Sequence, residues 1–235
     1  DISPGKLIIT LEKLTVKKAA ILLVNVPVDH SAGILQFKPF FSGKKLLTTQ
    51  TFHNLFRSEV IQGVEGIGIK DITILFTDLK GSTSLYDRIG DLKAFSLVSR
   101  HFDSLGKVVI KHSGAIVKTI GDAIMATFAN PVDAVQASIE MLQEIERFNN
   151  DFQSKEIILK IGIHKGASIV VTLNEGLDYF GQTVNIASRV QGLAQAEEIY
   201  ITGDIYNYPG VKELLKSFII DAGSAKLKGV QEEME

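Results

Sequence analysis

The spacing of apolar residues changes repeatedly between about residue 71 and residue 201, and this pattern limits the possible folds. A near-continuous apolar run, Asp71–Thr77, is typical of a buried strand. The segment after it has apolar residues three and four positions apart, which predicts one helix with a buried face. That face consists of Leu92, Phe95, Val98, Phe102, Leu105 and Val109. Two strands, a second helix and a third strand region then follow, at Ala115–Ile120, Ala123–Phe128, Asn130 onward and Ile157–Ile163. The order β-α-β-β-α-β predicts a ferredoxin-like α+β sandwich.

Further elements are expected after this unit. Ala167–Leu173 is predicted to be a separate strand, and Gly181–Leu193 a helix. Two late strands are expected at Glu198–Ile201 and Ser217–Asp221. The predicted fold is therefore a βαββαβ domain with extra C-terminal elements.

A boundary is expected near residue 62, where the stretch 62–68 contains three glycines. Residues 1–60 hold 8 Lys and Arg against 4 Asp and Glu, whereas residues 61–235 hold 17 against 23. The β-branched runs Lys6–Glu12 and Ala19–Val26 predict a small β-rich segment over residues 1–62. We interpret it as the end of an upstream regulatory module of the same chain, and residues 63–235 as the main domain. Because the sequence opens at Asp1, we expect it to be part of a longer protein.

Composition excludes several function classes. With a net charge of −2 and a pI of about 6.3, the chain lacks the basic balance typical of a nucleic-acid binder. The absence of cysteine excludes disulfides and thiolate metal sites, and fits the reducing cytoplasm where we expect the protein. The longest apolar run, 19–28, is interrupted by Asn25 and Pro27, so no membrane segment is predicted.

Two carboxylates follow or precede predicted strands. Asp78 comes directly after the Asp71–Thr77 run, and Asp122 lies in the tight turn before Ala123–Phe128. If these strands are neighbours, both side chains reach one edge of the sheet, where paired carboxylates suit Mg²⁺. Asp is also common as a loop cap and in turns, so the residues alone leave both roles open. A helix start that favours phosphate, Gly81, Ser82 and Thr83, follows Asp78.

Four segments together resemble a known family. They are FTDLKGST (76–83), KTIGDAIMATF (118–128), IGIHKG (161–166) and DYFGQTVNIASR (178–189). Their sequences and their order are similar to the class III adenylate/guanylate cyclase catalytic domain, over roughly residues 68–230. The resemblance implies a dimeric enzyme that forms a 3′,5′-cyclic nucleotide and pyrophosphate.

The resemblance also implies roles for individual residues. Asp78 and Asp122, helped by the carbonyl of Leu79, would bind two Mg²⁺ or Mn²⁺ ions. Asn185 would orient the ribose, and Arg189 would hold the α-phosphate with its planar guanidinium group. These two residues lie four apart on the predicted helix and so share one side of it.

Lys118 and Asp178 occupy the family's base-reading positions. Lysine only donates hydrogen bonds and an ionised aspartate only accepts them, which fits N1 and N6 of adenine and opposes guanine. The resemblance therefore implies ATP as substrate. For the triphosphate, the family places a lysine near the end of the domain, and Lys226 and Lys228 are the candidates, with Lys228 preferred.

In this family, one subunit supplies the metal-binding acids and its partner supplies the other groups, which implies a homodimer with two shared sites. Two alternatives remain: a guanylate cyclase, and an inactive nucleotide-binding domain with a regulatory role. The first is disfavoured by Lys118 and Asp178, and the second by the presence of both acids together with Asn185 and Arg189.

Overall fold

The computed structural model describes residues 42–55, 66–151, 157–173 and 176–228. The chain divides into two compact units, Asp1–Phe40 and Phe41–Glu235, and all described residues belong to the second. The strands expected at Lys6–Glu12 and Ala19–Val26 lie outside the described residues. The elements in chain order are α1 (Gly43–Leu47), α2 (Gln50–Leu55), β1 (Ile67–Leu79), α3 (Ser82–Ile89), α4 (Asp91–Lys111), β2 (Gly114–Ile120), β3 (Ala123–Phe128), α5 (Pro131–Asp151), β4 (Leu159–Leu173), β5 (Gly176–Phe180), α6 (Gln182–Leu193), β6 (Ile199–Ile201), α7 (Gly203–Tyr206) and α8 (Val211–Leu214).

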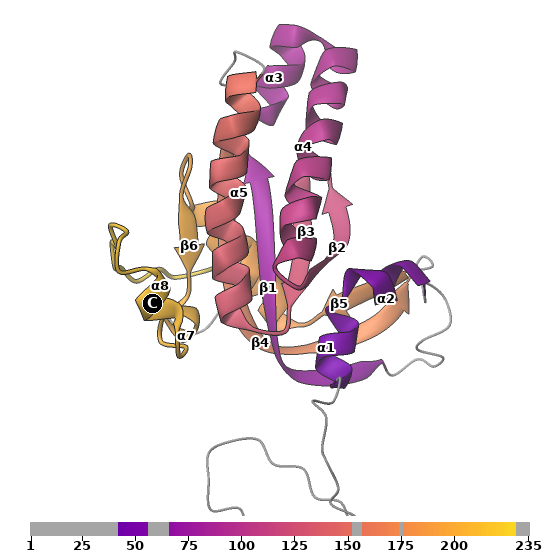
Figure 1. The fold of residues 1–235 in the computed structure, drawn as a ribbon, viewed down its shortest axis with the longest axis vertical. Coiled ribbons are helices and arrows are strands. Elements are labelled where there is room, and N and C mark those ends of the chain that lie inside the picture. The colour runs from indigo at the N-terminus through magenta and orange to yellow at the C-terminus, as the bar shows by residue number, and fades with distance from the viewer. Residues whose placement is uncertain (1–41, 56–65, 152–156, 174–175, 229–235) are drawn as a thin grey trace, which may run out of the picture. The chain divides into compact units, whose positions relative to one another are not determined.

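The strands of the described residues form one sheet of order β2-β3-β1-β4-β5, with β6 beside β4 (Figure 1). Neighbouring strands are antiparallel except β6, which runs parallel to β4. An antiparallel β2-β3-β1-β4 order with a helix after β1 and another after β3 is the ferredoxin-like arrangement. The predicted fold class is therefore confirmed.

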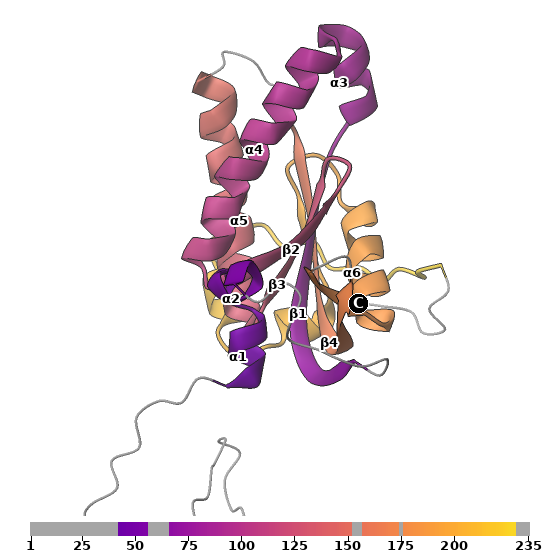
Figure 2. The same ribbon diagram turned by 90° about the vertical axis from the view of Figure 1, so that its right-hand side faces the viewer.

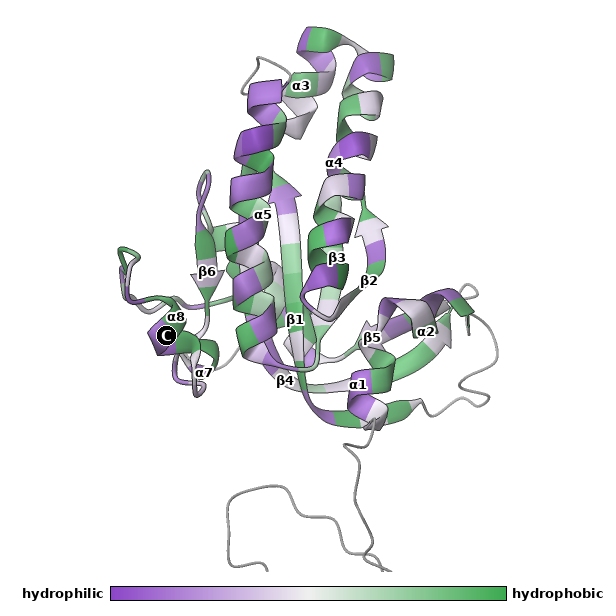
Figure 3. Cartoon of the chain, viewed as in Figure 1, coloured by the Kyte–Doolittle hydropathy of each residue, from purple (hydrophilic) through white to green (hydrophobic). Residues whose placement is uncertain are grey.

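Strand β1 is the middle strand of the sheet, and both of its faces are covered. Its residues 72–77 are all buried, and the apolar side chains of the strand are divided between two clusters. Ile74 and Phe76 belong to one cluster, whereas Leu75 and Leu79 belong to the other. Figure 3 shows apolar residues recurring between polar ones along α4 and α5.

Helices lie on both sides of the sheet. Helices α4 and α5 cover one face, and α6 lies on the opposite face (Figure 2). Helix α5 begins as its sequence predicts: Pro131 is its first residue, and the Asn130 side chain accepts a hydrogen bond from the Val132 N–H at 2.9 Å. No helix of the described residues combines the length and apolarity needed to span a membrane.

The helix after β1 differs from the prediction. A break at Gly90, whose φ is 81°, separates α3 from α4, because this backbone conformation is open to glycine and ends a helix. Leu92 and Phe95 were expected in the buried stripe but are 88% and 66% exposed. Of the remaining positions, Val98, Leu105 and Val109 are buried and Phe102 is half-buried.

The four strands predicted after β3 have different outcomes. The strands expected at Ile157–Ile163 and Ala167–Leu173 are one continuous strand, β4, which pairs along its length with β1 and then β5. The strand at Glu198–Ile201 is confirmed as β6. The strand at Ser217–Asp221 is wrong: these residues pair with no strand in the described structure, and Ile219 is fully exposed.

Candidate active site

The two predicted metal ligands lie together. Asp78 is the penultimate residue of β1, and Asp122 lies at the tip of the hairpin between β2 and β3. Because β3 pairs with β1, this tip reaches the end of β1, where the Leu79 N–H donates to Asp122 Oδ2 at 3.3 Å. The turn is tight because Gly121 adopts a φ of 62°. The sequence-based expectation that both carboxylates share one edge of the sheet is therefore met by the geometry.

A lysine that the sequence analysis did not single out joins this pair. Lys160 Nζ lies 2.9 Å from Asp78 Oδ2, and its side chain is only 19% exposed. The two residues face each other across β1 and β4 in the antiparallel register. Only this strand pairing reveals the contact, since Lys160 stands 82 positions from Asp78 in the sequence.

The start of α3 lies next to these acids in the chain. Gly81 precedes α3 with a φ of 75°, and no side chain caps the helix start. The Ser84 hydroxyl donates to the Gly81 carbonyl at 2.8 Å, and Gly81 and Thr83 are exposed while Ser82 is half-buried. The first turn of a helix carries unpaired N–H groups, so this end can accept an anionic group.

A buried histidine lies on α4 within reach of Asp122's charge. His101 is fully buried, and a ring nitrogen, Nδ1, bonds the Val98 carbonyl. Because a carbonyl only accepts, Nδ1 carries the proton. Burial lowers the pKa of His101 to about 4, although the Asp122 carboxylate acts in the opposite direction. This histidine is therefore neutral near pH 7 and adds no positive charge beneath the acids.

The residues at the base-reading positions form an ion pair. Lys118 Nζ lies 2.6 Å from Asp178 Oδ2, and the other carboxylate oxygen accepts the Tyr179 N–H at 2.8 Å. The Asp178 side chain is 10% exposed and that of Lys118 is 40% exposed. Although β2 and β5 occupy opposite ends of the strand order, the curled sheet brings these two side chains together.

Helix α6 carries the two residues assigned to the reaction centre. Asn185 is exposed and Arg189 is half-buried, while the opposite side of the helix packs against β4. That packing is very close, because an added Cβ at Gly162 would meet the Gln191 backbone N at 2.1 Å. The glycine in β4 therefore determines how near α6 lies to the sheet.

The C-terminal lysines lie near α6. Leu227 is buried in a small cluster with Ile186 and Val190 of that helix, so the chain on either side of it is held against α6. The neighbouring Lys226 and Lys228 are both exposed. The structure thus places both candidates close to α6 and gives no preference between them.

The described residues form two separate groups. No hydrogen bond or ion pair in the described structure links Asp78 or Asp122 to Lys118 or Arg189. The same residues contain no cluster of three or more His, Cys, Asp or Glu side chains that could enclose a metal ion. An ion held by these two acids would therefore take its remaining ligands from substrate phosphates and water.

Comparison with known proteins identifies the family of this domain. Residues 64–235 match the sequence model of the adenylate and guanylate cyclase catalytic domain. The chain belongs to this family. The match covers nearly all of the described sheet and helices, and the resemblance seen in the four sequence segments is confirmed.

Individual cyclases agree with this assignment. An adenylate cyclase of Anabaena cylindrica is 32% identical over 191 residues, which are 73% of this chain and 38% of that protein. Adenylate cyclase 1 of Rhizobium meliloti (strain 1021) is 27% identical, over 68% of this chain and 26% of that protein. The chain therefore spans only about a quarter to two fifths of the length of these curated relatives.

Among solved structures, the adenylyl cyclase CyaB from P. aeruginosa is 25% identical, with a TM-score of 0.62, over 73% of this chain and 93% of that chain. The guanylyl cyclase Cya2 has a TM-score of 0.64 at 21% identity, over 73% of this chain and 91% of that chain. The second comparison supports the cyclase fold alone.

Proposed function

We propose that this domain cyclises ATP to 3′,5′-cyclic AMP and pyrophosphate, at two equivalent sites shared across a homodimer. The observation that carries the proposal is the meeting of Asp78 and Asp122 at one end of the sheet of a cyclase-family domain. The choice of ATP rests on the Lys118–Asp178 pair.

Two divalent ions, Mg²⁺ or Mn²⁺, fit the donor set at the acids. Both side chains offer hard oxygen ligands, and the Leu79 backbone lies beside them. Asp78, Asp122 and the Leu79 carbonyl would hold the ions, which would supply electrophilic assistance to phosphoryl transfer. Lys160 is ion-paired with Asp78 in this structure. Once the Asp78 carboxylate binds a metal ion, Lys160 would be able to bind phosphate oxygens instead.

The remaining groups position the nucleotide. The start of α3 and the candidate Lys228 would receive the triphosphate, and Asn185 would orient the ribose. Arg189 would stabilise charge that builds on the α-phosphate oxygens as the ribose 3′-oxygen attacks and pyrophosphate leaves. Lys118 would donate to adenine N1, and Asp178 would accept from the N6 amino group.

Two subunits are proposed because the two groups of residues lie apart within one chain. The Lys118–Asp178 ion pair joins β2 to β5, whereas the acids lie at the end of β1. The partner would bring its own Lys118, Asp178, Asn185 and Arg189 to the first subunit's acids. We further propose that residues 1–62 regulate the dimer as part of an upstream module.

Turnover assays with ATP and GTP, each in Mg²⁺ and Mn²⁺ and across protein concentration, test substrate and assembly together. We expect cyclic AMP as the main product, with specific activity that rises with protein concentration. Asp78→Asn and Asp122→Asn should abolish turnover with little change in melting temperature. Cyclic GMP as the main product, or normal rates in either variant, would contradict the proposal.

Subunit mixing tests the shared site. Asp78→Ala and Arg189→Ala homodimers should each be inactive, whereas an equal mixture should recover about a quarter of wild-type activity. Half of the dimers in such a mixture are heterodimers, and each has one complete site. Absence of recovery in a heterodimer confirmed by differential tags would refute the two-subunit arrangement.

A further inference from the structure

The short helices α1 and α2 hold both strands that carry the Lys118–Asp178 pair. Gln50 Oε1, at the start of α2, accepts the Ile116 N–H of β2 at 2.7 Å. The Tyr179 hydroxyl of β5 donates to the Leu47 carbonyl, at the end of α1, at 2.7 Å. These two contacts span 66 and 132 positions of sequence, so they are properties of the tertiary fold.

The first contact lies beside Lys118. Ile116 is two residues before the lysine, and the pairing of β2 with β3 shifts its register between these positions. Strand β2 is at the edge of the sheet, so the Ile116 N–H has no partner strand on its outer side. Gln50 supplies the missing acceptor, and its amide group donates to Asn54 Oδ1 at 3.0 Å. Gln50 therefore fixes the irregular part of β2 from which Lys118 projects.

The second contact lies beside Asp178. Tyr179 is almost fully buried, and its backbone N–H holds one oxygen of the Asp178 carboxylate. Burial raises the pKa of the Tyr179 hydroxyl, which keeps it protonated as a donor to Leu47. The same Leu47 carbonyl also accepts from His53 Nε2 at 2.7 Å. The hydroxyl thus ties the backbone next to Asp178 to the end of α1.

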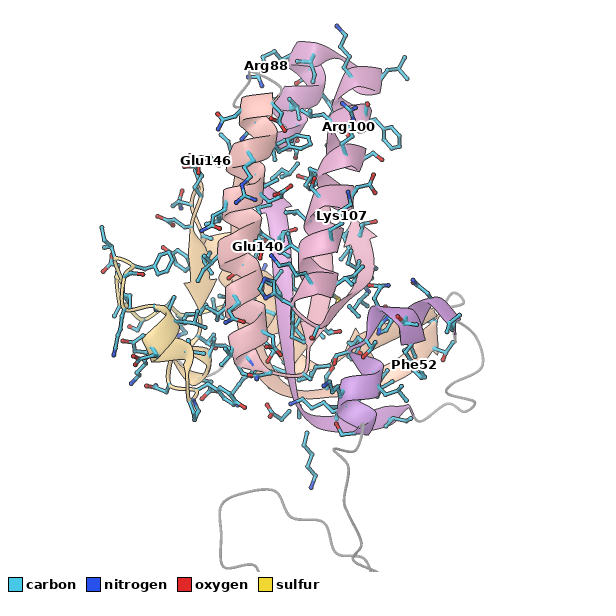
Figure 4. All side chains as sticks on the ribbon, viewed as in Figure 1. Phe52, Arg88, Arg100, Lys107, Glu140 and Glu146 are labelled. Carbon is cyan, nitrogen blue, oxygen red and sulfur yellow. The ribbon has the colours of Figure 1, made fainter. Side chains whose placement is uncertain are left out.

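Apolar packing joins the same parts. Leu47 and Tyr179 are buried in one cluster, and Phe52 of α2 and Val117 of β2 pack against it. Figure 4 labels Phe52 on α2 near the curled end of the sheet. Val117 stands directly between Ile116 and Lys118. Helices α1 and α2 therefore contact both β2 and β5, the strands that carry the ion pair, through polar and apolar groups.

We propose that Gln50 and Tyr179 are positioning residues that set the geometry of Lys118 and Asp178 and thereby the preference for ATP over GTP. The inference rests on the proposed function, because it assumes that this pair reads the base. Neither residue touches the nucleotide in this proposal. Each acts through the backbone next to a base-reading side chain.

The test compares kcat and KM for ATP and GTP in variants of the full chain. Tyr179→Phe removes the hydrogen bond to Leu47, and Gln50→Ala removes the bonds with Ile116 and Asn54. For both variants we expect the ATP-to-GTP ratio of kcat/KM to fall roughly two- to tenfold, mainly through a higher KM for ATP. Gln50→Glu keeps the acceptor oxygen and should restore the wild-type ratio. Thr51→Ala, at an exposed position of the same helix, is the matched control and should leave the ratio unchanged.

Lys118→Ala separates failure of this inference from failure of the proposed function. If Lys118→Ala loses selectivity while Gln50→Ala and Tyr179→Phe keep it, the positioning role is refuted and the proposed function stands. An equal loss of kcat for both nucleotides with an unchanged ratio would also refute the positioning role. A wild-type enzyme without turnover, or a selective Lys118→Ala variant, would overturn the proposed function and this inference with it.

Discussion

Replacement of Gly162 by alanine should separate α6 from the sheet and so disturb the residues assigned to the reaction centre. An ideal Cβ at this position would lie 2.1 Å from the Gln191 backbone N and 2.3 Å from its Cα, whereas ordinary contacts begin at 3.4 Å. The helix or β4 must therefore move by about 1.3 Å, and backbone atoms cannot turn aside as a flexible side chain can. Asn185 and Arg189 would move with the helix.

The expected loss of kcat is on the order of 100-fold, since a displacement of about 1 Å at reacting groups has that effect. Overpacking should also cost about 1–3 kcal/mol of unfolding free energy. Steady-state kinetics with ATP and thermal unfolding measure the two effects separately.

Gly192→Ala is the control because it makes the same change within α6 itself, at a position where no atom outside the helix backbone lies within 4 Å of the added Cβ. We expect wild-type turnover and an equal or higher melting temperature, since alanine favours a helix over glycine. If Gly162→Ala behaved like Gly192→Ala in both assays, the close approach of α6 to β4 would matter neither for activity nor for stability, and the reasoning would be refuted.

Two further predictions concern buried polar groups. The Thr77 hydroxyl accepts the buried Ile124 N–H at 3.0 Å, close to the two acids. Thr77→Val should therefore lower the unfolding free energy by about 1–3 kcal/mol and raise the metal concentration needed for half-maximal activity. Thr77→Ser keeps the acceptor and should leave the metal requirement unchanged, with a smaller loss of stability from the deleted methyl group. Denaturant unfolding and metal titration test this, and equal behaviour of the two variants would contradict it. Burial lowers the pKa of both His101 and His164 to about 4. As the pH falls, these histidines are protonated in the unfolded chain before they are protonated in the folded one. The free energy of unfolding should therefore be highest above about pH 6.5 and decrease toward pH 4, by at most about 3 kcal/mol per histidine. Urea unfolding that is independent of pH between about 7 and 5 would refute this.

Much of the fold follows from local sequence signals. The apolar run at the end of β1 could only be a strand covered on both faces, and the structure buries all of residues 72–77. The helix expected from Asn130 onward is α5, and the tight turn expected at Asp122 is the β2–β3 hairpin. These features depend on a few neighbouring residues, so the sequence alone reveals them.

The errors arise where the structure depends on contacts between distant parts of the chain. Apolar spacing included Leu92 and Phe95 in the buried stripe, but α4 extends beyond the sheet there and nothing in the described structure covers them. Ser217–Asp221 has the residues of a strand, yet a strand also needs a partner edge. The sequence cannot show which edges are available.

The same division holds in the candidate site. Asp78 and Asp122 each follow from a local pattern, because both stand where a strand ends or begins. Lys160 becomes visible only once β1 and β4 are paired, since the register places it opposite Asp78. The contacts of Gln50 and Tyr179 likewise depend on the curl of the sheet and on the position of α1 and α2, which no short motif encodes.

Strand β2 joins the two proposed half-sites within one subunit. Its hairpin tip carries Asp122, which would serve the subunit's own site, and its middle carries Lys118, which would serve the partner's. Gln50 holds this strand at its irregular position, so a movement of α2 would reach both sites of a dimer through one edge strand. An edge strand with a register shift is easier to displace than the central β1, which has neighbours on both sides.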